Sequence, residues 1–293
     1  SPPQPPPPPP PTLAQEATAT HHLPVDGKDR EFIVYQPAGV LSTALQPTVF
    51  MLHGTSGDGQ KFYNISGWKE KCAVEKCLAV FPSSLAYCID EGDGPKVTTK
   101  WNAGEVGTIV CPGQVLSDDV KFFREMVAFL KTNYRSDPAR IYVSGFSNGG
   151  SMATNLWGDA PDLFAAVAAS GGWSVDTATT PSVLVPYYFT IGSQDGHIAG
   201  KTGFAVPLPL DDTVFDVPAV RRMIVWPFTK LGLQDVHTTT TTAAGTLFVF
   251  STPGPVEMRV GIVNGLQHEY ANGTNHPLSY ATLFWDFFKQ YHK

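Results

Sequence analysis

The sequence has no long hydrophobic segment and no concentration of basic residues. No apolar run approaches the roughly 18 to 20 residues that a membrane-spanning helix needs, so no membrane span is predicted. The 293 residues include 20 Lys and Arg against 26 Asp and Glu. The resulting net charge of −6 argues against nucleic acid as the main partner and is typical of an ordinary solvated surface.

Cysteine is also scarce, and its spacing is not that of a metal site. The four cysteines, Cys72, Cys77, Cys88 and Cys111, include no C-x-x-C pair and have no histidine nearby. This disfavours a zinc site, and we expect neither a metal ion nor an organic cofactor. An even number of cysteines instead predicts two disulfides in an oxidising compartment, with three pairings open.

Proline is concentrated at the beginning of the chain. Residues 1–12 include seven consecutive prolines, which lack the N–H group that a helix or a sheet ladder needs. We therefore predict an exposed polyproline tail or linker over residues 1–27 and a single domain over residues 28–293. Such a tail often follows a removed signal peptide, which together with the disulfides predicts a secreted or periplasmic protein.

The most informative motif is Gly-Phe-Ser-Asn-Gly at residues 145–149. A β-branched and aromatic run precedes it and a helix-compatible run follows, which is the order of a G-x-S-x-G nucleophile elbow. The elbow would present the Ser147 hydroxyl above a sheet and aim the Asn148 N–H at a developing oxyanion. We expect the second oxyanion donor to be the Thr55 N–H, in the glycine-rich loop that follows an apolar strand.

Strands alternating with helices along the chain predict a mainly parallel sheet, with ligand sites beyond the carboxyl ends of the strands. We expect strands at residues 30–35, 48–52, 78–82, 141–143, 164–169, 183–191, 246–251 and 256–263. We expect helices at residues 66–74, 117–130, 151–157, 219–233 (kinked or interrupted at Pro227) and 277–291. The irregular segment 83–113 is interpreted as an insertion that disulfides hold in place and that shapes a cleft.

A serine nucleophile needs a base, and the base needs an orienting carboxylate. In α/β-hydrolases the chain order is nucleophile, acid, histidine, each on a loop after a strand, and Asp195 and His268 fit this order. His276 also follows the last strand. We favour His268 because His276 lies farther out, before a proline at the start of the final helix.

Several motifs resemble the extracellular polyhydroxybutyrate depolymerase and feruloyl esterase group of α/β-hydrolases. They lie at residues 52–54, 101–104, 118–122, 137–150, 160–168, 192–195 and 265–270, so the similarity covers about residues 28–291. The resemblance implies an α/β-hydrolase fold and a Ser147, His268, Asp195 triad. It also implies hydrolysis of esters, often in polymers, by secreted or periplasmic enzymes.

The motifs leave the substrate open between a polyester, an aryl ester such as a feruloyl ester, and an amide polymer. The histidine loop reads Gly-Leu-Gln-His-Glu-Tyr, where the group usually has Gly-Gly-Gly-His and a nearby Trp-Pro. A similar poly(aspartic acid) hydrolase is an alternative, whose polyanionic substrate would need a cationic cleft. The candidate cations between the acid and the histidine are Lys201, Arg221, Arg222 and Lys230. We favour an ordinary solvated surface for them. A hydrolase-fold binding protein without catalysis is a further alternative, which the presence of every site motif disfavours.

Three aromatic residues are candidates for gripping the substrate, because each lies on a loop near a predicted strand end: Trp101, Trp173 and Tyr270. Trp101 could equally anchor its loop onto the core. Glycosylation sequons begin at Asn64 and Asn272, and they matter only if the host glycosylates secreted proteins.

Overall fold

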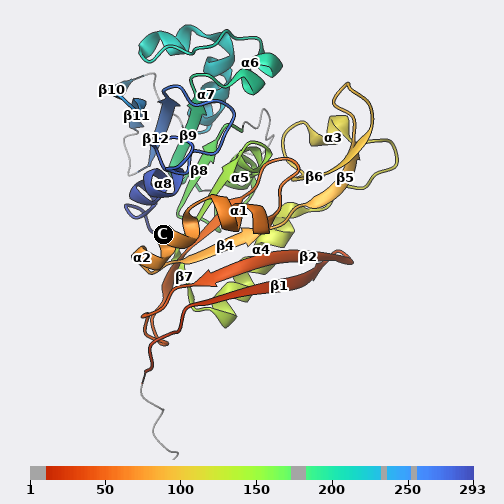
Figure 1. Cartoon of the computed structure of the whole chain (residues 1–293), viewed down its shortest axis with the longest axis vertical. Helices are drawn as coiled ribbons and strands as arrows, with labels where there is room; N and C mark the ends of the chain where they lie inside the picture. Colours follow the sequence, from red (N-terminus) through yellow and green to blue (C-terminus); the bar gives the residue numbers. More distant parts are fainter. Residues whose placement is uncertain (1–10, 173–182, 232–235, 252–255) are drawn as a thin grey trace, which may run out of the picture.

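A ten-stranded sheet forms the centre of the molecule (Figure 1), in the order β1-β2-β4-β3-β7-β8-β9-β12-β11-β10. The structure is a computed structural model that describes residues 11–172, 183–231, 236–251 and 256–293. The strands of this sheet are β1 (Ala17–Val25), β2 (Lys28–Gln36), β3 (Gln46–Leu52), β4 (Leu78–Pro82), β7 (Ser136–Phe146), β8 (Ala166–Ser170), β9 (Tyr187–Gly192), β10 (His237–Thr242), β11 (Gly245–Ser251) and β12 (Glu257–Val263). The six neighbouring strands in the middle of this order, β4, β3, β7, β8, β9 and β12, pair in parallel. The strands outside them pair antiparallel, β2 and β1 at one edge and β11 and β10 at the other.

The central strands are apolar along their whole length because helices cover both faces of the sheet. Every residue of β4, β8 and β9 is buried, which is the pattern of a parallel strand between two helical layers. Alternate residues of β3 enter two separate cores, since Phe50 and Leu52 face one layer while Val49 and Met51 face the other. The sheet therefore fixes which strand ends meet at the carboxyl edge, where the site lies.

The helices divide between the two faces. They are α1 (Gly59–Ile65), α2 (Trp68–Glu75), α3 (Val106–Ile109), α4 (Asp119–Asn133), α5 (Asn148–Asp159), α6 (Gly196–Thr202), α7 (Pro218–Leu231) and α8 (Tyr280–Phe288), with a 3₁₀ turn at Asp212–Asp216. One core takes buried side chains from α4, α5 and α7, and the other takes them from α1, α2 and α8. Of the expected kink or interruption at Pro227, the interruption is wrong, because α7 continues through this residue to Leu231.

The predicted boundary between a tail and a domain at residue 27 is also wrong. Residues 17–25 form the edge strand β1, which pairs with β2 along its whole length. Its alternating exposure is that of a half-buried strand, and Pro24 is tolerated there because β1 lies at the edge of the sheet. Residues 12–14 are also attached, through backbone hydrogen bonds to residues 39–42.

The insertion at residues 83–113 has more regular structure than the sequence suggested. Its β5 (Leu85–Ile89) and β6 (Lys96–Lys100) form an antiparallel hairpin outside the main sheet, and α3 follows. The predicted pair of disulfides is confirmed as Cys72–Cys77 and Cys88–Cys111. The second bond links β5 to the residues after α3, so it closes the insertion on itself.

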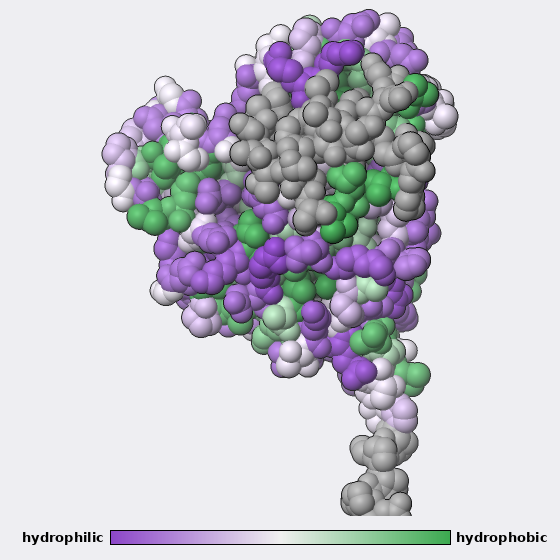
Figure 2. All heavy atoms as spheres, turned by 180° about the vertical axis from the view of Figure 1, so that it is seen from behind, coloured by the Kyte–Doolittle hydropathy of each residue, from purple (hydrophilic) through white to green (hydrophobic). Residues whose placement is uncertain are grey.

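The surface opposite to the view of Figure 1 mixes hydrophilic residues with small hydrophobic patches (Figure 2). Among the described residues, no helix combines the length and apolar character needed to span a membrane.

Candidate active site

Ser147 occupies the sharp turn between β7 and α5. Its backbone has φ 54° and ψ −123°, a region that non-glycine residues rarely adopt. The turn is held by two hydrogen bonds, from the Ser147 N–H to the Ser170 carbonyl and from the Ser151 N–H to the Ser147 carbonyl, both 2.9 Å. The local geometry is thus that of the nucleophile elbow expected from the motif.

Two glycines of the motif allow the strand and the helix to approach each other this closely. A Cβ atom on Gly145 would lie 2.0 Å from the Gly149 carbonyl oxygen. A Cβ atom on Gly149 would lie 2.4 Å from the carbonyl oxygens of Leu52 and His53. Since real Cβ atoms are not found at these distances, any other residue at either position would displace the elbow or the loop after β3.

His268 and Asp195 lie beside Ser147, as the chain order predicted. The Ser147 hydroxyl is 2.9 Å from Nε2 of His268, and Nδ1 of the same ring is 2.9 Å from Oδ2 of Asp195. Asp195 follows β9 and is 1% exposed, and its Oδ1 accepts a hydrogen bond from the Ile198 N–H at the start of α6. The carboxylate can therefore hold the His268 ring with Nδ1 protonated and Nε2 free to accept the serine proton.

Two other histidines, His276 and His197, make different contacts. His276 bonds through Nε2 to the Asn264 carbonyl. His197 lines the cavity and stacks on the His268 ring with centroids 4.4 Å apart. Partial burial, and then its neighbour His268, lower the pKa of His197. A neutral His197 adds bulk beside His268 without adding charge.

His53 is a site residue whose function the sequence did not reveal. It is fully buried, and burial lowers its pKa to about 4, so the ring is neutral near pH 7. Its Nε2 accepts from the Ser84 N–H at 2.9 Å, which leaves Nδ1 to donate to the Gly54 carbonyl at 2.7 Å. The ring therefore fixes the backbone just before Thr55, whose N–H was expected to face an oxyanion.

The Asn148 side chain ties the elbow to the insertion. Its Oδ1 accepts from the Trp101 N–H at 2.6 Å, and its Nδ2 donates to the Trp101 carbonyl at 3.2 Å. Trp101 in turn donates from Nε1 to the His53 carbonyl at 2.9 Å. Trp101 is thus hydrogen-bonded both to Asn148 and to the backbone two residues before Thr55, which are the two expected oxyanion residues.

A buried ion pair holds the backbone next to Trp101. Nη2 of Arg30 lies 2.6 Å from Oδ1 of Asp119, and both side chains are almost completely buried. Oδ2 of Asp119 accepts from the Asn102 N–H at 2.7 Å, next to Trp101. Asp119 therefore connects the insertion to β2 and α4, and it does not face the cavity as a catalytic carboxylate would.

A cavity of about 330 Å³ opens beside Ser147. Its walls come from the loop after β3, the insertion, the elbow, α6 and the histidine loop. The described lining residues are Gly54, Thr55, Glu91, Lys100, Ala103, Gly104, Glu105, Val106, Phe146, Ser147, Asn148, Ser151, Gly171, Gly172, His197, Ile198, Lys201, Thr202 and His268. This volume suits one small group of a substrate around the scissile bond, with the remainder outside.

Most of the predicted substrate-binding residues do not reach this cavity. Trp101 is fully buried and serves as the anchor described above, and Tyr270 is 5% exposed and packs against Phe62, Phe146 and Tyr280. Neither can contact a substrate, so these two predictions are wrong. Both large apolar rings lie near a strand end, but they fill the core and do not face the cavity.

The remaining substrate-binding predictions have different outcomes. Trp173 lies outside the described residues. Arg221 and Arg222 lie exposed on α7 and are not among the described residues that line the cavity. The prediction that they serve the cleft is therefore wrong, because α7 turns its buried face, including Val220 and Met223, toward the core and these arginines outward.

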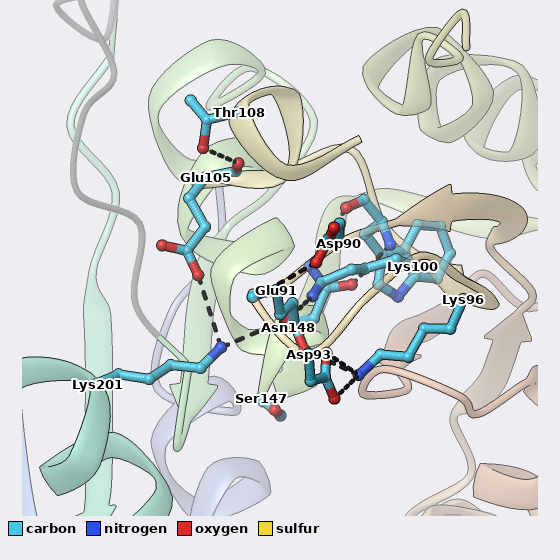
Figure 3. Close-up of polar contacts among 12 residues, drawn as sticks. Asp90, Glu91, Asp93, Lys96, Lys100, Glu105, Thr108, Ser147, Asn148 and Lys201 are labelled. Atoms are coloured by element: carbon cyan, nitrogen blue, oxygen red, sulfur yellow. Dashed lines mark hydrogen bonds and ion pairs between the residues drawn. The ribbon is translucent and has the colours of Figure 1, made fainter. Parts of the chain in front are cut away.

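One wall of the cavity is charged (Figure 3). Nζ of Lys100 lies 2.5 Å from Oε1 of Glu91, and Nζ of Lys201 lies 3.6 Å from Oε1 of both Glu91 and Glu105. The hydrogen bond from Lys100, opposed by partial burial and aided by the nearby lysine charges, lowers the pKa of Glu91. Among the described residues, no group of three or more His, Cys, Asp or Glu side chains is arranged to hold a metal ion.

Solved structures place this arrangement in a known fold. An acetyl xylan esterase from Aspergillus awamori superposes with a TM-score of 0.60 at 14% identity, over 92% of this chain and 99% of that one. An S-formylglutathione hydrolase from Agrobacterium tumefaciens gives a TM-score of 0.58 at 11% identity, over 95% and 98%. The chain has the α/β-hydrolase fold. The predicted fold class, with a mainly parallel sheet and helices on both faces, is confirmed.

Sequence relatives of this chain belong to the group that its motifs resemble, which confirms the resemblance. A poly(3-hydroxybutyrate) depolymerase from Ralstonia pickettii is 28% identical over 85% of this chain and 54% of its own length. A poly(3-hydroxyalkanoate) depolymerase C from Paucimonas lemoignei is 31% identical over 49% and 31%. A feruloyl esterase B from Piromyces equi is 28% identical over 48% and 24%. The chain thus spans about half or less of the length of these curated relatives.

A prolyl oligopeptidase family model also matches the chain, over residues 113–200. The matched stretch includes Ser147 and Asp195 but ends before His268.

Proposed function

We propose that this protein is a secreted serine hydrolase that cleaves carboxylic ester bonds by acyl transfer. The observation that supports this most strongly is the hydrogen-bonded series from Ser147 through His268 to Asp195, beside an open cavity. The strained backbone of Ser147 adds to it, because such strain is retained where it serves a mechanism.

In the proposed mechanism, Nε2 of His268 takes the proton of the Ser147 hydroxyl as its oxygen attacks the ester carbonyl. Asp195 stabilises the imidazolium that forms, and the N–H groups of Asn148 and Thr55 donate to the oxyanion. His268 then gives the proton to the departing alcohol oxygen. Water attacks the acyl-enzyme by the same route and restores Ser147.

A polymeric ester is the proposed natural substrate. Depolymerases and feruloyl esterases are among the sequence relatives, and a cavity of about 330 Å³ admits only the group around one scissile bond of a longer chain. The two disulfides support export to an oxidising compartment, outside the cell or in the periplasm.

The structure gives little support to a polyanionic amide substrate. Both lysines among the described lining residues, Lys100 and Lys201, are paired with carboxylates. A polyaspartate chain would bring further negative charge to a wall whose positive charge is already balanced. An inactive binding protein would have no need of the Ser147 and His268 geometry.

The test compares the protein with its Ser147→Ala variant in p-nitrophenyl acetate hydrolysis and in labelling by a fluorophosphonate probe. We expect labelling at Ser147 and a fall in kcat of at least about 10⁴-fold in the variant, because the attacking atom is lost. Ser279→Ala, at the start of α8 and remote from the cavity, is the matched control and should retain both signals. Folded protein that neither reacts with the probe nor turns over esters would refute the proposal.

A further inference from the structure

Four charged residues form one continuous wall of the cavity, here called the ionic wall: Glu91, Lys100, Glu105 and Lys201. Three of them come from the insertion and the fourth from α6, so the wall joins two segments that are far apart in the sequence. Figure 3 shows Lys201 extending toward Glu105 and Glu91, in the cavity that Ser147 also lines.

The position of the wall assigns it to one half of an ester. In the proposed mechanism His268 protonates the departing alcohol oxygen, so the alcohol half must lie on the His268 side of Ser147. His197 stacks on His268 and lies on α6, and Lys201 follows it by four residues on the same face of that helix. The ionic wall therefore lies beside the alcohol half of the substrate.

The charges of the wall determine what can bind there. The charges of the two lysines and two glutamates among the described lining residues cancel. An anionic or cationic alcohol would leave one of these charges uncompensated, and an alkyl group would remove water from ion pairs without replacing its hydrogen bonds. A neutral hydroxyl group avoids both costs because it donates to a carboxylate and accepts from an ammonium group.

The distances between Lys201 and the two glutamates leave these side chains able to form hydrogen bonds with a hydroxyl group of a ligand. Lys201 lies 3.6 Å from each glutamate, beyond the 2.7 to 3.2 Å of a direct N–H···O bond. Its ammonium group thus attracts both carboxylates without donating to either. The side chains of Lys201 and Glu105 are 41% and 61% exposed, so a ligand in the cavity can reach them. Lys100 differs, since it is buried and bonded to Glu91 at 2.5 Å.

We infer that the ionic wall is a subsite for the alcohol half of the ester, and that it takes a neutral alcohol with several hydroxyl groups, such as a sugar. This inference rests on the proposed esterase function. Lys201 and Glu105 are the residues that select the substrate, and Lys100 holds Glu91 in place beside them.

The test uses acetate esters that share one acyl group and differ only in the alcohol: a monoacetylated methyl glycoside, cyclohexyl acetate and 3-acetoxybutyrate. We expect the wild type to favour the glycoside ester over cyclohexyl acetate at least about tenfold in kcat/KM. Glu105→Gln and Lys201→Gln should each reduce that ratio about five- to tenfold, mainly through KM, because a charged hydrogen bond is lost. Asp286→Asn is the matched control, since Asp286 is exposed on α8, pairs with Lys289 outside the cavity and should leave the ratio unchanged.

The outcomes separate the subsite from the underlying activity. Hydrolysis that depends on Ser147, with a ratio near one in the wild type or with no change in either variant, would refute the subsite alone. A preference for the anionic 3-acetoxybutyrate would also refute it. Folded protein that hydrolyses none of the esters, p-nitrophenyl acetate included, would refute the proposed function itself.

Discussion

At the scale of single residues, the site depends on backbone atoms that are held by side chains remote from the chemistry. Ser147 keeps a left-handed backbone that costs about 1 to 3 kcal/mol. His53 holds the Gly54 carbonyl on one side of the elbow, and the Asn148 side chain holds the Trp101 backbone on the other. These contacts stabilise one loop conformation before any substrate binds, which is what an oxyanion site requires.

The buried His53 ring predicts a loss of stability in acid. Its pKa is lowered from 6.5 to about 4, so between these pH values the unfolded chain binds a proton that the folded protein does not. The contribution of this neutral ring is complete above pH 6.5 and is lost as the pH falls, by up to about 1.4 kcal/mol per unit. We expect His53→Gln to be less stable at pH 7 but to lose stability more slowly from pH 6.5 to 4.

Urea denaturation at a series of pH values measures this difference. His292→Gln, in which an exposed histidine is replaced, should follow the wild-type slope. If the stability curves of the wild type and His53→Gln run parallel, burial does not lower the pKa of His53 and the prediction is wrong.

At the scale of elements, the insertion combines two tasks. Its Trp101 segment supports the elbow, and its hairpin and α3 region supply Glu91, Lys100 and Glu105 to the cavity. The α6 helix completes the same wall, and its first residues also hold Asp195. A change in the insertion should therefore affect substrate binding and the elbow together.

The two disulfides should differ in their effects. Cys88–Cys111 closes a separation of 23 residues and Cys72–Cys77 one of 5, for which loop-closure entropy gives about 3 and 2 kcal/mol. Cys88→Ser/Cys111→Ser should lower the free energy of unfolding more. It should also raise KM, because it loosens the insertion that carries the ionic wall. Cys72→Ser/Cys77→Ser should leave KM unchanged. Urea denaturation and ester kinetics on both double variants check this, and equal effects on KM would contradict it.

At the scale of the whole molecule, β1 belongs to the folded domain. His21 lies among Phe32, Phe129 and Tyr134, and its Nε2 is 2.6 Å from the Tyr134 hydroxyl, while Val25 is 2% exposed. A chain that begins at Lys28 loses these contacts and exposes the edge of β2.

We expect this truncation to lower the free energy of unfolding by about 3 to 5 kcal/mol and to promote aggregation, because the buried Val25 and the half-buried His21 and Leu23 are lost. Thermal unfolding and light scattering measure the two effects. His21→Ala keeps the strand and should have a smaller effect. A truncated chain as stable and as soluble as the full one would show that residues 17–25 are dispensable, as a linker would be.

The sequence by itself determined the fold class and the order of the site residues. Apolar runs that alternate with amphipathic segments predict a parallel sheet, and the glycines around Ser147 predict a turn that only they permit. Both signals are local, so they can be read without the tertiary structure. The even number of cysteines likewise predicted two disulfides, but their pairing depends on which Cα atoms the fold brings together.

Only the tertiary structure decided which side chains face the cavity. Trp101 and Tyr270 have the same type of sequence position as a substrate-binding aromatic residue, and packing buries both. Lys201 and Glu105 lie in segments with no recognisable motif, and they meet because α6 and the insertion lie at the same edge of the sheet. Burial and long-range pairing depend on the arrangement of the whole chain, and a local pattern does not contain that information.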